Sequence, residues 1–411
     1  MQYKLNKLAL GTLAIGHMAV DMQTSSLAVM IPLLYVTYNL DYGSAALIIT
    51  LNSLTSSFTQ PLFGIISDKK PLRWLLPSGV LLASGGTVLV LFMPSYWLVL
   101  LVVIISGLGS AAYHPEGSRN ANYVSGPVKA TGVSVFFVGG NLGFTIGPIL
   151  TTLLIAIFGF SGVFVLLIPA SIAAFLLWRL LPLYAEYSVL AKNQPATSRK
   201  KASYEVKGRR GLVGIMTLLL SIISFRSVIQ TGMVTFIPLY LLTLPGGSKE
   251  EAAFLLAVFL FAGAIGTLIG GRLADRLGSK NVMAGSMLIT CPALLIFLNT
   301  SGIIQLVAIA IAGAALISAS SLTVVMAQAI MPKSIGLASG LTLGLGFGAG
   351  GLGAAALGKY ADWFGIGQTM VIIAFLPLAI LALSLFMPTA KPSTPTPQAV
   401  PVAEMASPSG E

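Results

Sequence analysis

The chain has 411 residues, of which 56% are hydrophobic and only 9% are charged, and its formal net charge is +11. Soluble domains carry about 25% charged residues, so this composition excludes an ordinary soluble enzyme and indicates a polytopic membrane protein. Its single cysteine, Cys291, lies in an apolar stretch, which excludes a framework of disulfide bonds or cysteine-bound metals.

Apolar runs follow one another along the chain, separated by polar or Gly/Pro-rich turns, and we count twelve. Each is about 20 residues long, as a membrane-spanning helix requires. The first run carries His17 and Asp21 and ends without a small-residue cleavage site, so it does not resemble a removable signal peptide. The runs centre on Met22, Thr55, Ser84, Val103, Gly140, Ile172, Ile229, Phe261, Thr290, Leu316, Gly346 and Ala379.

The basic residues are distributed unevenly between the two sides of the predicted membrane. Of the 23 Lys and Arg residues, 19 fall on the side of the N-terminus and only Lys249 and Lys359 fall on the opposite side. The positive-inside rule therefore places both termini and the middle loop in the cytoplasm. No basic stripe interleaved with aromatic residues indicates nucleic-acid binding.

A polar, basic segment, residues 190–211, divides the predicted spans six and six. It predicts a cytoplasmic linker, with a short amphipathic helix along the membrane surface as a further possibility, between an N-terminal bundle (1–189) and a C-terminal bundle (212–387). The tail, 388–411, is rich in Pro, Thr, Ser and Ala and is predicted to be disordered. The sequence thus predicts an all-α membrane protein of two six-helix bundles.

Two loops, 207 residues apart, repeat the pattern Gly-x-x-x-Asp-basic. The glycine allows close helix contact, and the aspartate can accept hydrogen bonds from the N-terminus of a neighbouring helix. Two copies at matching places favour a releasable latch over a mere helix end followed by basic residues. The residues concerned are Gly64, Asp68, Lys69 and Arg73 in the first loop and Gly271, Asp275, Arg276 and Gly278 in the second.

These loops resemble the signature loop of the major facilitator superfamily, although Pro71 and Leu72 depart from it in the first copy. Within that superfamily the chain resembles the fosmidomycin resistance protein family, proton-linked drug exporters of the bacterial inner membrane. The resemblance implies twelve helices in two bundles related by a pseudo-two-fold axis, with spans one and four lining a central cavity. It is carried by His17…Asp21-Met22, Gln60-Pro61…Gly64…Asp68, His114-Pro115-Glu116-x-Ser118-Arg119 and Gly139-Gly140-Asn141-x-Gly143…Gly147-Pro148, and it covers all but the linker and the tail.

Asp21 and Glu116 are the two acidic residues that lie well inside predicted spans. A charge at the membrane centre costs about 2.5–3.5 kcal/mol on insertion scales, so these side chains are expected to face protein or water. We predict that Glu116 is the principal proton carrier and Asp21 the second. The alternatives are a permanent ion pair of Glu116 with Arg119, which shares its helix face, and a helix-packing hydrogen bond at Asp21.

The only two histidines flank these carboxylates in sequence. His17 lies four residues before Asp21 on the same helix face, and His114 lies two residues before Glu116. Because histidine titrates near neutral pH, either could relay protons, and we assign His17 to proton coupling and His114 to substrate contact. The alternative for each is a neutral imidazole bonded to a backbone carbonyl.

A candidate substrate site lies in span seven, where Gln230 follows Arg226 by one helical turn. Arginine binds carboxylate or phosphonate groups with two parallel hydrogen bonds, although near a helix end it can also simply extend to the membrane surface. Gly143, Gly147 and Pro148 partly match the glycine-proline motif of drug/proton antiporters, but close helix packing explains the glycines equally well. The remaining polar candidates for substrate contact are Arg119, Asn141 and Gln60.

No Gly-x-Ser-x-Gly, His-Glu-x-x-His or phosphate-binding loop occurs, so no enzyme activity, metal or cofactor is expected. The sequence instead predicts a monomeric, proton-coupled antiporter that exports a small anionic or amphiphilic compound. Two alternatives stay open: a proton symporter that imports a sugar or an organic acid, and a membrane sensor that does not transport.

Overall fold

The computed structural model describes residues 3–70, 72–194, 208–245 and 247–388. The predicted tail and most of the predicted linker lie outside these residues, so the bundle boundaries at 189 and 212 stay predictions. Within the described residues all regular structure is helical.

The helices follow the predicted spans, and all twelve predicted centres fall inside them. In chain order they are α1 (Lys7–Thr37), α2 (Tyr42–Lys69), α3 (Leu75–Leu89), the 3₁₀ helix η1 (Val90–Phe92), α4 (Tyr96–Val124), α5 (Lys129–Phe158), the 3₁₀ helix η2 (Gly159–Leu166), α6 (Leu167–Arg179), α7 (Leu181–Lys192), α9 (Gly208–Thr243), α10 (Lys249–Leu277), α11 (Ser279–Asn299), α12 (Gly302–Ile330), α13 (Ile335–Phe364) and α14 (Ile366–Leu385).

Ten helical stretches in the described residues are long and apolar enough to cross a membrane. One of them, Lys129–Arg179, contains both α5 and α6. The more polar α2, which carries Asn52 and Gln60, is not among the ten and completes the set of twelve. Large apolar side chains such as Ile149 and Phe175 are exposed on the outer faces, as contact with lipid requires.

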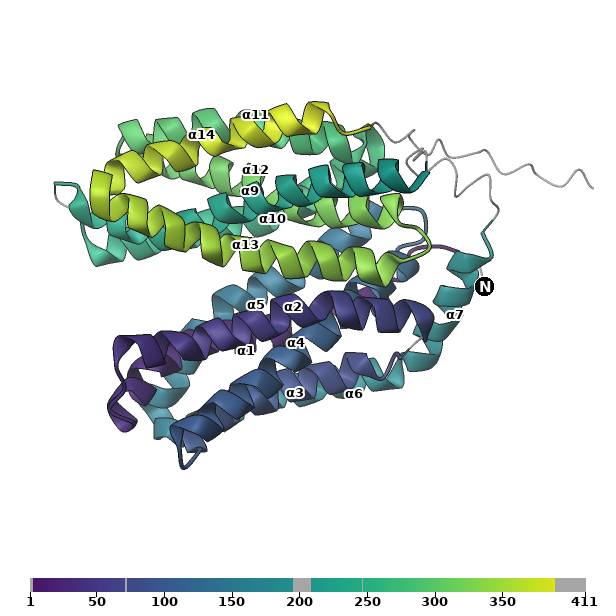
Figure 1. Ribbon diagram of the computed structural model, residues 1–411, viewed down its shortest axis with the longest axis horizontal. Helices are drawn as coiled ribbons and strands as arrows, with labels where there is room; N and C mark the ends of the chain where they lie inside the picture. The colour runs from purple at the N-terminus through teal and green to yellow at the C-terminus, as the bar shows by residue number, and fades with distance from the viewer. Residues whose placement is uncertain (1–2, 71, 195–207, 246, 389–411) are drawn as a thin grey trace, which may run out of the picture.

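The helices form two bundles that lie side by side (Figure 1). Helices α1–α6, purple through blue to teal, make one half, and α9–α14, teal through green to yellow, make the other. Each half has its own apolar core: Tyr113, Phe136 and Leu177 lie in the first, and Phe259 and Phe297 lie in the second. A side-chain oxygen of Asp41 caps α2, and the hydrogen bond from the Ser44 amide lowers the pKa of this exposed carboxyl.

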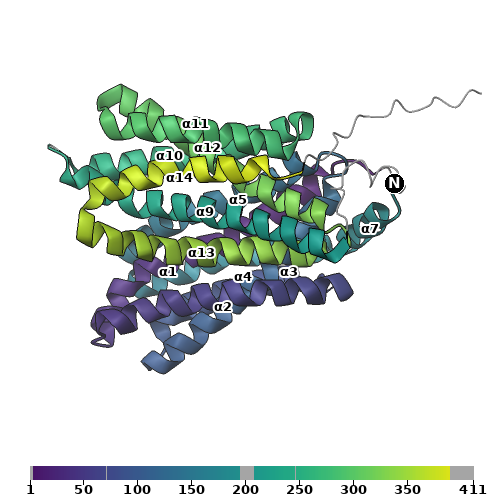
Figure 2. The same ribbon diagram turned by 45° about the horizontal axis from the view of Figure 1, so that its top comes forward.

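The two halves meet along α2 against α13 and along α5 against α10, and Figure 2 shows α13 running beside α2. Gly64 of α2 faces the backbone of Gly336, and Gly340 of α13 faces the backbone of Gln60, so neither position has room for a side chain. Close contact of this kind fixes two long helices along a shared line.

Candidate functional site

The start of α1, the turn after α2 with Lys69 and Arg73, and α7 lie at one end of the molecule (Figure 1), which we call the basic end. Here each signature-loop aspartate bonds to a helix of the opposite half. Asp68 accepts hydrogen bonds from the amides of Gly336 and Leu337 at the start of α13, both at 2.8 Å. Asp275 accepts them from Ala130 and Thr131 at the start of α5, at 3.0 and 2.9 Å. Free amides at a helix N-terminus favour a negative charge, so these pairs hold the basic end closed.

Of the remaining predicted latch residues, some make contacts within the basic end and others are exposed. Gly271 packs against Ser134 and the carbonyl of Ala130 on α5, and Gly278 ends α10 with a positive φ of 86°. Arg73 donates a hydrogen bond to Ser188 of α7, and burial lowers the pKa of its guanidinium. Lys69 and Arg276 are exposed.

Polar side chains join the halves again deeper in the basic end. Gln328 of α12 accepts a hydrogen bond from Asn122 of α4 at 2.7 Å and donates to Ser118 at 3.0 Å. It also donates to Ser339 of α13, and the hydroxyls of Ser134 and Ser321 pair at 2.8 Å. We call Asn122, Gln328 and Ser118 the buried bridge; burial makes such hydrogen bonds directional and selective for one helix arrangement.

A second group, the His17–Asp21–His114 cluster, lies within the N-terminal half between α1 and α4. The Nε2 atom of His114 lies 3.1 Å from Oδ1 of Asp21, and the Nε2 atom of His17 lies 3.2 Å from Oδ2. All three residues are buried. The sequence spacing predicted the His17–Asp21 pair, whereas His114 joins it from a helix 93 residues away.

Helix α5 packs against this cluster. A side chain at Gly140 would collide with His17 and Asp21, so only glycine leaves room for them. Phe136 stacks on the His17 ring at a centroid distance of 4.1 Å. The hydroxyl of Ser110 contacts Nδ1 of His114. The hydroxyl of Ser56 donates a hydrogen bond to the hydroxyl of Ser110, and the side-chain amide of Gln60 donates one to the hydroxyl of Ser56.

The three cluster residues are also the group, among those described, that could hold a metal ion, since their ligand atoms lie within 4.8 Å of one another. One cation would need both imidazoles and the carboxylate to point at a single centre. The two oxygens of Asp21 instead face different imidazoles, which suits two separate hydrogen bonds. The donor set therefore fits protons better than it fits a shared metal ion.

Glu116 and Arg119 form the fully buried ion pair that their spacing on α4 predicts. Arg119 Nη2 lies 2.8 Å from Oε1 of Glu116 and 2.7 Å from Oε2, and the amide of Asn120 donates to Oε1. Arg119 also donates to the carbonyl of Ser67 and lies 3.9 Å from the carboxylate of Asp68. This ion pair therefore touches the closed latch at the basic end.

In the C-terminal half, Arg226 lies near the middle of α9 and is buried. Its Nη1 donates to Gln230 at 2.5 Å and to Ser320 at 2.7 Å, and its Nη2 donates to Ser227 at 3.0 Å. Its Nε has no partner, and no carboxylate of the described chain lies within 4.0 Å of its nitrogens. The snorkelling alternative does not fit a position this far from either helix end.

The other predicted polar candidates are also placed inside the protein. The Nδ2 of Asn141 and the Oε1 of Gln60 are buried without partners. The predicted packing glycines Gly143 and Gly147 of α5, the second beside Pro148, lie against the backbone of α1 at Met18 and Met22.

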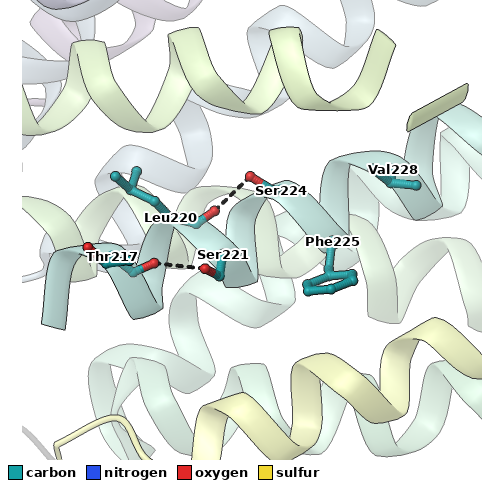
Figure 3. Close-up of a pocket in the computed structure, with 6 residues that line it drawn as sticks. All are labelled: Thr217, Leu220, Ser221, Ser224, Phe225 and Val228. Carbon is teal, nitrogen blue, oxygen red and sulfur yellow. Dashed lines mark hydrogen bonds between the residues drawn. The ribbon is translucent and has the colours of Figure 1, made fainter. Parts of the chain in front are cut away.

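A shallow groove along α9 is lined by three hydroxyl residues together with Leu220, Phe225 and Val228 (Figure 3). Two of the hydroxyls already have partners, since Ser221 and Ser224 donate to carbonyls one turn earlier on the same helix. The groove contains none of the buried charged residues, so we do not assign the substrate to it.

Comparison with known proteins places this architecture in a family. The Major Facilitator Superfamily model matches residues 13–354 and, in a second match, residues 241–406. The chain belongs to this superfamily: it is a multi-pass membrane transporter for a small-molecule substrate and not an enzyme.

More particularly, the chain is 35% identical to the Fosmidomycin resistance protein of Escherichia coli (strain K12), over 92% of each chain. It is 34% identical to the uncharacterized MFS-type transporter YfnC of Bacillus subtilis (strain 168), over 90% of each. The crystal structure of the MFS transporter FucP in the outward conformation has a TM-score of 0.69 at 16% identity, covering 94% of this chain and 99% of that one. The family resemblance and the fold predicted from sequence are thereby confirmed.

Sequence reasoning missed the partners that come from other helices. It assigned His114 to substrate contact and predicted no contact for Gln328 or Asn122. The available signal was the density of polar residues at the end of α4, but their partners depend on how α4 packs against α1 and α12.

Proposed function

We propose that this transporter exchanges protons for a small anionic compound and exports that compound from the cytoplasm. The observation that carries the proposal is Arg226, a cation buried in the membrane-spanning part of the C-terminal half, with no carboxylate partner among the residues that the structure describes. Uncompensated buried charge costs several kcal/mol, so an anionic group is the natural occupant beside this side chain.

The neighbours of Arg226 favour an anion with several acceptor oxygens. Gln230, Ser227 and Ser320 hold the Nη nitrogens, while Nε remains available as a donor. A planar guanidinium fixed in this way matches the paired oxygens of a carboxylate or a phosphonate. Gln230 then acts as a positioning residue.

Proton coupling is proposed for the N-terminal half, where Asp21 and Glu116 are both buried. Protonation of Glu116 would weaken its hold on Arg119 and free the guanidinium for Asp68, 3.9 Å away, which caps α13. A charge change inside one bundle would thus alter the latch between the bundles. Alternating access then follows from rocking of the two halves.

The name of the E. coli relative, a resistance protein, favours export over import. We propose the bacterial inner membrane as the location, with the basic end in the cytoplasm as charge asymmetry predicts. Since the structure is closed at the basic end, it would then represent an outward-facing state.

The test uses inside-out vesicles, acidified inside and reporting internal pH by fluorescence. We would add fosmidomycin and then a panel of phosphonates and carboxylates. Export by antiport predicts substrate-triggered proton efflux, lost in Arg226→Gln and retained in the exposed control Arg209→Gln on the same helix. Glu116→Gln and Asp21→Asn should keep substrate binding but lose uphill transport.

Other results would redirect the assignment. Substrate entry that requires an opposite proton gradient would establish symport. Absence of flux for every compound, with folding verified by thermal denaturation in detergent, would favour the sensor alternative. Normal transport by Arg226→Gln would remove the proposed anion site.

A further inference from the structure

Helix α7 turns away from the line of α6 and crosses the end of the N-terminal half (Figure 1). Its inner face is fixed there, since the hydroxyl of Tyr184 donates to the carbonyl of Ala9 at 3.1 Å and Ser188 accepts from Arg73 at 3.0 Å. The bend between the two helices leaves a hollow of about 330 Å³. We call the residues that line it the α6–α7 corner: Trp178, Arg179, Leu181 and Pro182.

Arg179 is the charged residue of this corner. It is the last residue of α6, its side chain is exposed, and it forms no hydrogen bond or ion pair with the described part of the chain. Trp178 is 57% exposed and lies beside Phe175, with 6.1 Å between the ring centroids. Tryptophan favours the headgroup level of a membrane, and a guanidinium binds a phosphate through two parallel hydrogen bonds. The corner thus combines an unpaired cation with an aromatic wall.

An apolar stripe on one face of α6 leads to this corner. Its members, Ile168, Ile172, Phe175 and Trp178, follow one another at intervals of three or four residues, and each is more than half exposed. From Ile168 to Trp178 a helix rises about 15 Å, which is half of the hydrocarbon thickness of about 30 Å in a bilayer. The stripe therefore matches the acyl chains of one leaflet, and it ends beside the cation.

We propose that the α6–α7 corner binds one anionic phospholipid, of the phosphatidylglycerol type, from the leaflet at the basic end. Its phosphate pairs with Arg179, its headgroup fills the hollow, and an acyl chain lies along the α6 stripe. Anionic lipids attract basic residues at the membrane surface, whereas a zwitterionic lipid already carries an ammonium group to balance its phosphate. The site is independent of the proposed proton coupling and anion export.

Other basic residues of the basic end lack this combination of features. Arg73 is already bonded to Ser188, and Lys280 donates to the carbonyls of Leu385 and Met387. Lys192, the last residue of α7, is exposed but does not line the hollow. It is therefore a suitable control, since it carries the same charge on the same interfacial segment.

The tryptophans of the chain allow lipid binding to be measured at this corner. Trp74→Phe, Trp97→Phe and Trp363→Phe, all at exposed positions, leave Trp178 as the only indole. We would reconstitute this full-length protein in phosphatidylcholine bilayers that contain phosphatidylglycerol with brominated acyl chains, which quench a neighbouring indole. The reverse mixture, with brominated phosphatidylcholine and plain phosphatidylglycerol, then gives the relative affinity of the two lipids.

The expected result is a preference for phosphatidylglycerol at Trp178 of about 10-fold, the effect of one charge-assisted hydrogen bond. Arg179→Gln should remove this preference, whereas Lys192→Gln should keep it. A matched protein whose only indole is Trp97, at the start of α4 and the opposite end of the bundle, should show no preference. Thermal denaturation would verify that each variant is folded.

Equal quenching by the two lipids at Trp178 would overturn the site. An equal loss of preference in Arg179→Gln and Lys192→Gln would replace it with a diffuse attraction between the membrane and the basic end. Quenching that inorganic phosphate abolishes, but chloride of the same ionic strength does not, would assign the corner to a soluble anion. If Arg179→Gln does not fold, an equal preference at Trp178 and Trp97 would still reject the proposal.

Discussion

The two halves of this transporter share a scaffold but bury different charges. In the N-terminal half, Asp21 is flanked by two imidazoles and Glu116 is paired with Arg119. In the C-terminal half, Arg226 is bonded to hydroxyls and an amide, and no carboxylate of the described part of the chain pairs with it. The loops at the basic end are nevertheless alike, since Asp68 and Asp275 cap helices of the opposite half in the same way.

On the proposed function, this difference gives the two halves separate chemistry. Carboxylates with internal basic partners can gain or lose protons without a ligand, whereas a lone buried cation needs an external anion to neutralise it. On the proposed function, the two halves keep similar latch loops, while their buried side chains serve proton exchange in the N-terminal half and anion binding in the C-terminal half. Each prediction below tests one side of that division.

The largest effect is expected at Arg226. A charged hydrogen bond is worth about 1.5–3 kcal/mol, so Arg226→Gln should weaken anion affinity by roughly 10- to 150-fold. Arg226→Lys keeps the positive charge but loses the planar guanidinium, so its affinity for the anion should fall between those of the wild type and Arg226→Gln. Binding measured by isothermal titration with the transported anion would check the order; equal affinity in all three proteins would contradict an anion half.

The next effect is expected at Gly140, where a methyl group would overlap His17 and Asp21. Overpacking of this kind costs about 1–3 kcal/mol, so Gly140→Ala should lower the melting temperature and abolish proton coupling. Gly11→Ala on α1 is the matched control, because nothing lies within 4 Å of the added methyl group. Unchanged coupling in Gly140→Ala would show that the cluster can rearrange freely.

A smaller effect distinguishes the two latches. Asp68→Asn and Asp275→Asn each remove a negative charge from a helix N-terminus, worth about 0.3–1 kcal/mol and up to about 2 kcal/mol when partly buried. Asp68 also neighbours Arg119, so its substitution should open the basic end more often than the Asp275 substitution does. Spin labels at Lys70→Cys and Lys333→Cys would report the open fraction, and a larger effect at Asp275 would reverse the predicted order.

The smallest effect is expected at Asp41, which caps α2 and belongs to neither the proposed proton site nor the proposed anion site. The hydrogen bond from Ser44 lowers the pKa of Asp41 below its ordinary value of 3.8, so its contribution to stability is present above that pH and is lost as pH falls through the folded-state value. Asp41→Asn should lower the melting temperature slightly at pH 7 and not at the most acidic pH that the fold tolerates. A pH-independent difference would assign the effect to the changed cap geometry.

The fold was largely predictable from sequence, because hydropathy and span length mark helices that must satisfy their own backbone hydrogen bonds in lipid. The site was predictable only where partners share a helix, as His17 and Asp21 or Glu116 and Arg119 do. His114 reaches Asp21 only through the packing of α1 on α4, and Gly140 permits it only through the packing of α5 on α1. Such contacts depend on interhelical register, which residue spacing along one helix does not specify.

The reciprocal caps at the basic end have a consequence for membrane energetics. An aspartate of each half caps a helix of the other half. Neither half can therefore move away from its partner while either cap remains hydrogen-bonded. Opening of the basic end therefore requires both caps to break. If the protein is the proton-coupled carrier proposed above, with its basic end in the cytoplasm, this requirement limits the leak of protons and spares the proton-motive force between transport cycles.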